Sequence, residues 1–136
     1  MGTKKSDIAD MERMIEENYP EFLSVASILT KREMSRVEKY IDPRYREIVR
    51  HSFRLVSSIR ARIKRLIGYY NISADVLDLH FDYDDQGDLE LSEFTIIHLD
   101  DLTVDVVPSY ISLEDLDRLE DITAETFLYL DMILPC

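Results

Sequence analysis

The chain contains few of the residues that build covalently linked or metal-stabilised folds. Its 136 residues include a single cysteine, Cys136, and no tryptophan. One cysteine excludes an internal disulfide framework and a thiolate zinc cluster. The three glycines, Gly2, Gly68 and Gly87, are too scattered to form a phosphate-cradling loop. No run of about 18 apolar residues is present, so we expect a soluble, cytoplasmic protein without a transmembrane segment.

Amide side chains are also scarce, because the chain holds only Gln86, Asn18 and Asn71. Together with 32% charged residues, this scarcity is typical of heat-tolerant proteins. A chain of this length with 46% hydrophobic residues can bury about two thirds of the surface that its unfolded form exposes. We therefore expect one core and a single domain over 1–136.

Charge is segregated along the chain more strongly than the net charge of −12 suggests. Residues 1–30 contain three basic and six acidic side chains, and residues 31–67 contain twelve and four. Residues 68–136 contain one basic side chain, Arg118, and eighteen acidic ones. The three segments carry −3, +8 and −17, which predicts a basic middle followed by an acidic half.

Helical periodicity runs through residues 1–70. Apolar residues recur every three to four positions before Pro20, which itself suits the first turn of a second short helix. Thr30 and Glu33 have the spacing of a capping box for a third helix through about Ile41. These signals predict three short helices before the main one.

The strongest helix signal begins at Asp42-Pro43. The Asp side chain can accept hydrogen bonds from the free backbone N–H groups there, and Pro occupies a position that needs no N–H. One apolar stripe then steps by three and four residues, with Gly68 near the fraying end. The opposite side of this helix, 43–67, is rich in arginine, a charge density that suits phosphates. The residues that we expect to contact nucleic acid, if it is a partner, are Arg46, Arg50, Arg54, Arg62 and Lys64.

From Val76 the apolar period changes to two, which is the alternation of a β-strand. Asp85-Gln86-Gly87 fits a three-residue hairpin loop with its glycine in the left-handed position. This register places Tyr83 opposite Leu89, so that the apolar rows of the two strands share one face. A slip in the pattern near Ser92 predicts a β-bulge.

A third short strand is expected from the alternation of Leu102, Val104 and Val106, and we expect it to end at Pro108. The order of elements then predicts an α+β fold. Its parts are N-terminal helices including one long basic amphipathic helix over 1–70, a three-stranded antiparallel meander over 76–108, and short C-terminal helices over 112–134.

The segment from Asp82 to Phe94 resembles an EF-hand calcium loop. The resemblance implies that Ca²⁺ is held by the side chains of Asp82, Asp84, Gln86 and Glu93, with Gly87 at the sharp turn. An EF-hand needs a helix on both sides of the loop, whereas the residues before it alternate with period two. A hairpin is therefore the preferred interpretation, and calcium binding is an alternative.

The hairpin brings like charges together, because Asp82 faces Glu90 and Asp84 faces Asp88. Like charges directly across a strand pair are destabilising unless nearby cations neutralise them. The cations could be the chain's own arginines, a basic partner surface or a bound divalent ion. Our first hypothesis is a non-catalytic interaction or regulatory subunit that binds a protein partner through Asp82, Asp84, Asp88 and Glu90. Its opposite basic and acidic patches also suit self-association into a homo-oligomer.

The sequence SIRARIKRLI over 58–67 is similar to the arginine-bearing helix of GINS replication-factor subunits. The similarity covers one helix. It implies a role in the assembly of proteins around a helicase.

Residue types that carry out catalysis are sparse. His51, His80 and His98 lack metal-ligand spacing, and the one arrangement that suits a general base is His80 near Asp78, Asp82 and Ser92. No second signal accompanies it. We therefore expect no enzyme, no catalytic residue and no cofactor beyond the calcium alternative.

Overall fold

The computed structural model describes residues 5–69, 76–98 and 100–118 of the chain. Four helices are followed by three strands and a short helix, an order that confirms the predicted α+β class. The last helix expected before residue 134 lies outside the described residues. Within the described helices, none is both long and apolar enough to cross a membrane. The elements are α1 (Lys5–Glu17), α2 (Tyr19–Ser27), α3 (Lys31–Tyr40), α4 (Pro43–Tyr69), β1 (Val76–Tyr83), β2 (Leu89–His98), β3 (Thr103–Ser112) and α5 (Leu113–Arg118).

Helices α3 and α4 begin where the sequence predicts caps. Thr30 Oγ1 accepts the N–H of Glu33 at 3.1 Å, and Glu33 Oε1 accepts the N–H of Thr30 at 3.0 Å. These hydrogen bonds hold the pKa of the Glu33 carboxyl below its usual value. At the start of α4, Asp42 Oδ1 accepts the N–H of Arg44 at 3.0 Å, and this bond lowers the pKa of Asp42. Both starts satisfy backbone donors that have no partner inside the helix.

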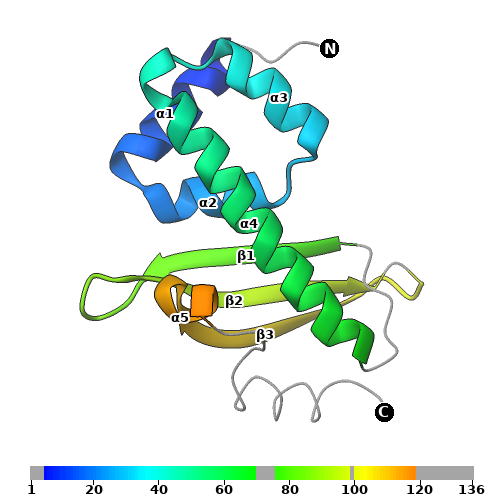
Figure 1. Ribbon diagram of the computed structural model, residues 1–136. Helices are drawn as coiled ribbons and strands as arrows, with labels where there is room; N and C mark the ends of the chain where they lie inside the picture. The colour runs from blue at the N-terminus through cyan, green and yellow to red at the C-terminus, as the bar shows by residue number, and fades with distance from the viewer. Residues whose placement is uncertain (1–4, 70–75, 99, 119–136) are drawn as a thin grey trace.

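Helix α4 connects the two parts of the molecule (Figure 1). Its first half lies among α1, α2 and α3, and its second half crosses one face of the sheet. Its buried side chains extend from Tyr45 to Ile67. They belong to a single cluster of buried residues that also includes Ile8 of α1 and Ile111 of β3. The helices and the sheet therefore share one hydrophobic core.

The sheet is antiparallel with the strand order β1-β2-β3. Tyr83 pairs with Leu89 and Phe81 with Leu91, as the hairpin loop predicts. The register then shifts by one residue at Ser92, in agreement with the predicted bulge. On the other edge of β1, the side chains of α2 accept hydrogen bonds from backbone N–H groups of the strand.

Strand β3 differs from the prediction in its length. It passes through Pro108 and ends only at Ser112, so the expected end at Pro108 and the range 76–108 for the meander are wrong. Proline is tolerated because β3 is an edge strand, where one side of the backbone needs no ladder partner. Pro108 also pairs with Glu93 beside the bulge, where the regular ladder is interrupted.

The residues that β3 buries are not those of the alternating apolar row in its sequence. Val107 and Ile111 are the buried residues, with 0% and 2% exposure. Val104 and Val106 are 55% and 44% exposed, and Leu102 precedes the strand with 80% exposure. The alternating apolar row therefore points away from the core.

Candidate functional site

The loop between β1 and β2 is held by its own backbone and by one carboxylate. Asp84 N donates to Asp88 O over 2.8 Å, and Gly87 N donates to Asp84 O over 3.0 Å. The Asp84 carboxylate also accepts the N–H groups of Gln86 and Asp88, at 2.9 and 2.8 Å. Gly87 has φ of +81°, the left-handed conformation that the sequence predicts. Asp84 therefore shapes the loop as well as carrying charge.

The four carboxylates predicted as a contact patch lie together in this hairpin. Asp82 and Glu90 are direct partners across the two strands, and Asp84 and Asp88 are joined through the backbone. Burial, followed by the charges of Asp84, Asp82 and Asp85, raises the pKa of the Glu90 carboxyl. We call the group formed by Asp82, Asp84, Asp88 and Glu90 the acidic hairpin.

No cation among the described residues pairs with the acidic hairpin. The ion pairs between two described residues lie elsewhere, mostly in the helical part. They are Arg13–Asp10, Arg44–Asp42, Arg50–Glu38, Arg50–Glu47 and His98–Asp105. The arginines of α4 therefore do not neutralise the like charges of the hairpin.

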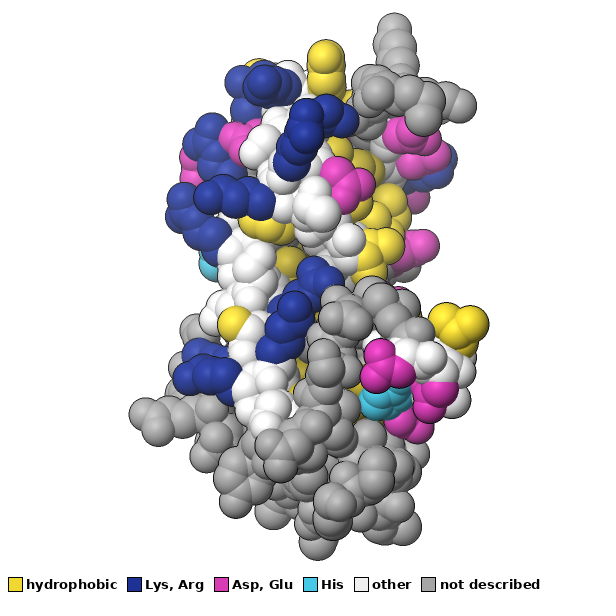
Figure 2. Space-filling model, turned by 90° about the vertical axis from the view of Figure 1, so that its right-hand side faces the viewer, with side chains coloured by type: hydrophobic (Ala, Val, Ile, Leu, Met, Phe, Trp, Pro, Cys, Tyr) yellow, Lys and Arg dark blue, Asp and Glu magenta, His cyan; other side chains and the backbone are white. Residues whose placement is uncertain are grey.

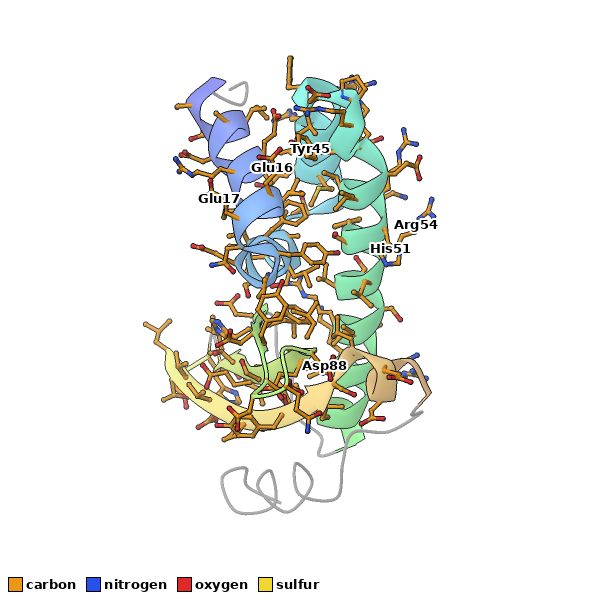
Figure 3. The ribbon with its side chains drawn as sticks, turned by 90° about the vertical axis from the view of Figure 1, so that its left-hand side faces the viewer. Glu16, Glu17, Tyr45, His51, Arg54 and Asp88 are labelled. Carbon is orange, nitrogen blue, oxygen red and sulfur yellow. The ribbon has the colours of Figure 1, made fainter. Side chains whose placement is uncertain are left out.

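The hairpin extends beyond the helices that cover the rest of the sheet (Figure 1). Asp88 lies at its accessible end (Figure 3). At the end of β1, the side chain of Tyr83 is 52% exposed, on the face of the strand pair opposite to Asp82 and Glu90. Tyrosine is enriched at protein interfaces because its ring is apolar and its hydroxyl can form hydrogen bonds. The hairpin therefore carries an exposed aromatic ring as well as its carboxylates.

Two of the arginines predicted to contact nucleic acid instead attach α3 to α4. Arg46 donates to two backbone carbonyl oxygens at the end of α3, at 3.4 and 3.5 Å. Arg50 forms ion pairs with Glu38 of α3 and with Glu47 of its own helix. These two cations are therefore largely engaged within the fold.

The other three predicted cations, Arg54, Arg62 and Lys64, form no ion pair with the other described residues. Arg54 and Lys64 are exposed, and Arg62 is half-buried. Lys and Arg side chains gather over α3 and α4 (Figure 2), and Arg54 points outward beside His51 (Figure 3). The basic face is thus split into an engaged N-terminal part and a free part farther along α4.

The residues that resemble a calcium loop are not arranged as one. Strands, not helices, flank the loop. Asp84 uses its carboxylate to hold the loop, and Glu93 lies in β2 between His80 of β1 and Pro108 of β3. Among the described residues, no three His, Cys, Asp or Glu side chains come together as a metal-binding group.

The histidines of the sheet have local partners. His98 Nε2 lies 2.9 Å from Asp105 Oδ2, a pair that the sequence pattern does not reveal. The strand register brings the two together, because Asp105 pairs with Ile96 on β2. His80 contacts Thr95 through its ring at 3.4 Å, and it forms no hydrogen bond with Asp78 in the described part of the chain. The predicted general-base arrangement is therefore not assembled by hydrogen bonds.

No protein-family model, curated protein or solved structure matches this chain. Its function is therefore inferred from the chemistry of its surfaces. The two surfaces with a distinct chemistry are the acidic hairpin and the free cations of α4.

Proposed function

We propose that this protein is a non-catalytic interaction subunit whose acidic hairpin binds a basic surface of a protein partner. The observation that supports this proposal is the close pairing of Asp82 with Glu90 without a cation from the described residues. Like charges across a hairpin destabilise the strand pair. A Lys or Arg of a partner relieves that repulsion, and it favours the ionised form of Glu90.

The shape of the hairpin supports the same function. The hydrogen bonds of Asp84 hold the loop before any partner arrives, so little conformational entropy is lost on binding. The excess of negative charge accelerates the encounter with a basic partner, and the effect weakens as salt screens it. The exposed ring of Tyr83 offers apolar contact on the opposite face of the same hairpin.

A charge-reversal experiment tests this function. The probe is a fluorescein-labelled lysine-serine repeat peptide, and its binding is followed by fluorescence anisotropy. We expect D82K/E90K to weaken binding about tenfold or more, which corresponds to about 1.4 kcal/mol. The matched control is E16K/E17K on α1, which changes the net charge equally at two exposed acids (Figure 3). Equal losses in both variants would show attraction by net charge alone and would refute the role of the hairpin.

A second candidate function is nucleic-acid binding through the free cations of α4. The observation that favours it is that Arg54, Arg62 and Lys64 form no ion pair with the other described residues. The test is the anisotropy of labelled duplex and single-stranded DNA and RNA at about 50 and 200 mM salt, between which phosphate contacts weaken strongly.

The substitutions that test this candidate are R54E/K64E, with K31E/R32E on α3 as the control of equal charge change. Binding that is lost only in R54E/K64E would support the α4 surface. Binding that is absent at both salt concentrations, or lost equally in both variants, would exclude it.

A further inference from the structure

The sheet has one face that no described helix covers. Helices α4 and α5 lie on one side of the sheet, and the described residues place only side chains on the other (Figure 3). We call this second side the outer face. The strand register sets its rows, which are Ile97–Val104, Asp78–Thr95–Val106, His80–Glu93–Pro108 and Asp82–Glu90–Ser112.

The outer face is apolar along β3. Val104 and Val106 are 55% and 44% exposed, and they lie beside the half-buried Ile97 and Pro108. In an antiparallel sheet with one face in water, the outward positions are normally polar. A continuous exposed apolar row of this kind marks an interaction surface.

The outer face is acidic along β1 and toward the hairpin. Asp78 and Asp82 both point to this face from β1, and Glu90 and Glu93 occupy the neighbouring positions of β2. The whole segment 76–112 contains no Lys or Arg. One flank of this face is therefore negative and the other apolar.

We infer that the outer face docks a basic amphipathic helix of the protein partner. The apolar stripe of that helix lies on Ile97, Val104 and Val106, and its Lys and Arg side chains lie beside Glu90 and Glu93. The inference rests on the proposed function, because the acidic hairpin supplies Asp82 and Glu90 to this same face. A helix is about 10 Å across and strands are about 4.8 Å apart, so one helix covers β2 and parts of both neighbours.

The free edge of β3 is a poorer site than the face. Pro108 has no N–H to donate to an added strand. Tyr110 has φ of +51°, which turns the backbone out of the extended conformation. A strand added at this edge would meet an interrupted ladder, so the partner binds across the face.

The amphipathic segments of this chain do not have the required chemistry. The apolar stripe of α4 is already buried, with Val49 and Ile63 at 0% exposure. The segment 119–136 contains apolar residues such as Phe127 and Leu130, but its charged residues are all acidic. A basic amphipathic helix must therefore come from another protein.

The test uses the full-length chain and two labelled 18-residue peptides of leucine and lysine. One has leucine at i, i+3, i+4 and i+7, and the other has the same composition without a helical stripe. We expect the striped peptide to bind about tenfold more tightly. V104T/V106T removes this advantage and leaves the binding of the unstriped peptide unchanged. The control is I28T/I48T, which alters two exposed apolar residues of the helical part, 52% and 38% exposed.

The outcomes separate this inference from the proposed function. If V104T/V106T retains the advantage of the striped peptide while D82K/E90K weakens both peptides, the inference is wrong and the acidic hairpin keeps its role. If D82K/E90K weakens neither peptide, the proposed function itself fails. Tighter peptide binding by F127S/L130S would identify the chain's own C-terminal segment as the occupant and overturn the inference. If the protein sediments as a dimer and V104T/V106T dissociates that dimer, a second copy of the chain occupies the outer face. This result would also overturn the inference.

Discussion

Ser27 of α2 takes the place of a neighbouring strand for Leu79 of β1. Its Oγ accepts the backbone N–H of Leu79 at 3.3 Å, and Ser24 Oγ accepts the N–H of Phe81 at 3.1 Å. Unpaired strand edges attract other strands, so natural sheets cover them. Here two serines on one helical turn close the edge of β1 and join the sheet to the helical part. Arg60 of α4 strengthens the junction, because its Nη1 donates to Ser27 O at 2.6 Å.

Replacing Ser27 with alanine leaves the buried N–H of Leu79 without its acceptor. An unsatisfied buried donor costs about 1–3 kcal/mol, so S27A lowers the free energy of unfolding by that amount in urea denaturation. The control S57A changes an exposed serine of α4, where we expect a change within about 0.5 kcal/mol. Equal effects of S27A and S57A would contradict the assigned role of Ser27.

Alanine substitutions at two glycines should have opposite effects. Gly87 has φ of +81°, where a Cβ is strained, so G87A destabilises the protein by about 1–2 kcal/mol. A Cβ at Gly68, which lies within α4, meets nothing within 4 Å. G68A therefore stabilises by up to about 1 kcal/mol, because alanine favours the helix. Thermal unfolding of the two variants measures whether each is more or less stable than wild type. A G87A variant as stable as wild type would contradict the loop geometry.

Glu90 should make stability fall as pH rises. Because burial and the charges of Asp84, Asp82 and Asp85 raise its pKa, the folded protein holds this proton more tightly than the unfolded chain. The resulting stability is full below the ordinary pKa of 4.5 and is lost as pH rises through the raised value. At pH 7, E90Q should be more stable than wild type by roughly 0.2–1 kcal/mol.

The measurement for Glu90 is the unfolding midpoint from about pH 3 to about pH 7, with Glu33→Gln as the control of opposite sign. The pKa of Glu33 is lowered by Thr30, so its stability contribution is present above its ordinary pKa and lost as pH falls. A profile of E90Q that follows the wild type at every pH would show that Glu90 titrates normally.

Features set by neighbouring residues are predictable from the sequence. The capping box of Thr30 and Glu33 and the left-handed Gly87 both depend on residues at most three positions apart. The hairpin register follows from the loop length, which is enough to place Asp82 opposite Glu90. The carboxylates of the acidic hairpin therefore lie together as expected.

The direction of β3 could not be predicted in this way. Alternation shows that Val104 and Val106 share a face, but it does not show which face is buried. The core instead takes Val107 and Ile111, because β3 pairs Val107 with the buried Phe94 and Ile111 with the buried Leu91. The alternating apolar row of β3 therefore forms part of the outer face.

The division of the basic face of α4 also depends on long-range structure. Arg50 pairs with Glu38, twelve positions earlier in the chain, because α3 folds back beside α4. Arg46 reaches carbonyl oxygens at the end of the same helix. A helical pattern alone places all five predicted cations on one helix and gives no sign of which ones α3 engages.

The acidic hairpin is proposed to recognise a basic protein surface. The most direct measurement is a titration of ¹⁵N-labelled protein with the lysine-serine peptide, observed through backbone amide shifts at about 50 mM salt. We expect saturable shifts concentrated in residues 80–93, which D82K/E90K abolishes and E16K/E17K preserves. Shifts centred on the acids of α1, or small shifts spread over the whole molecule, would contradict this claim.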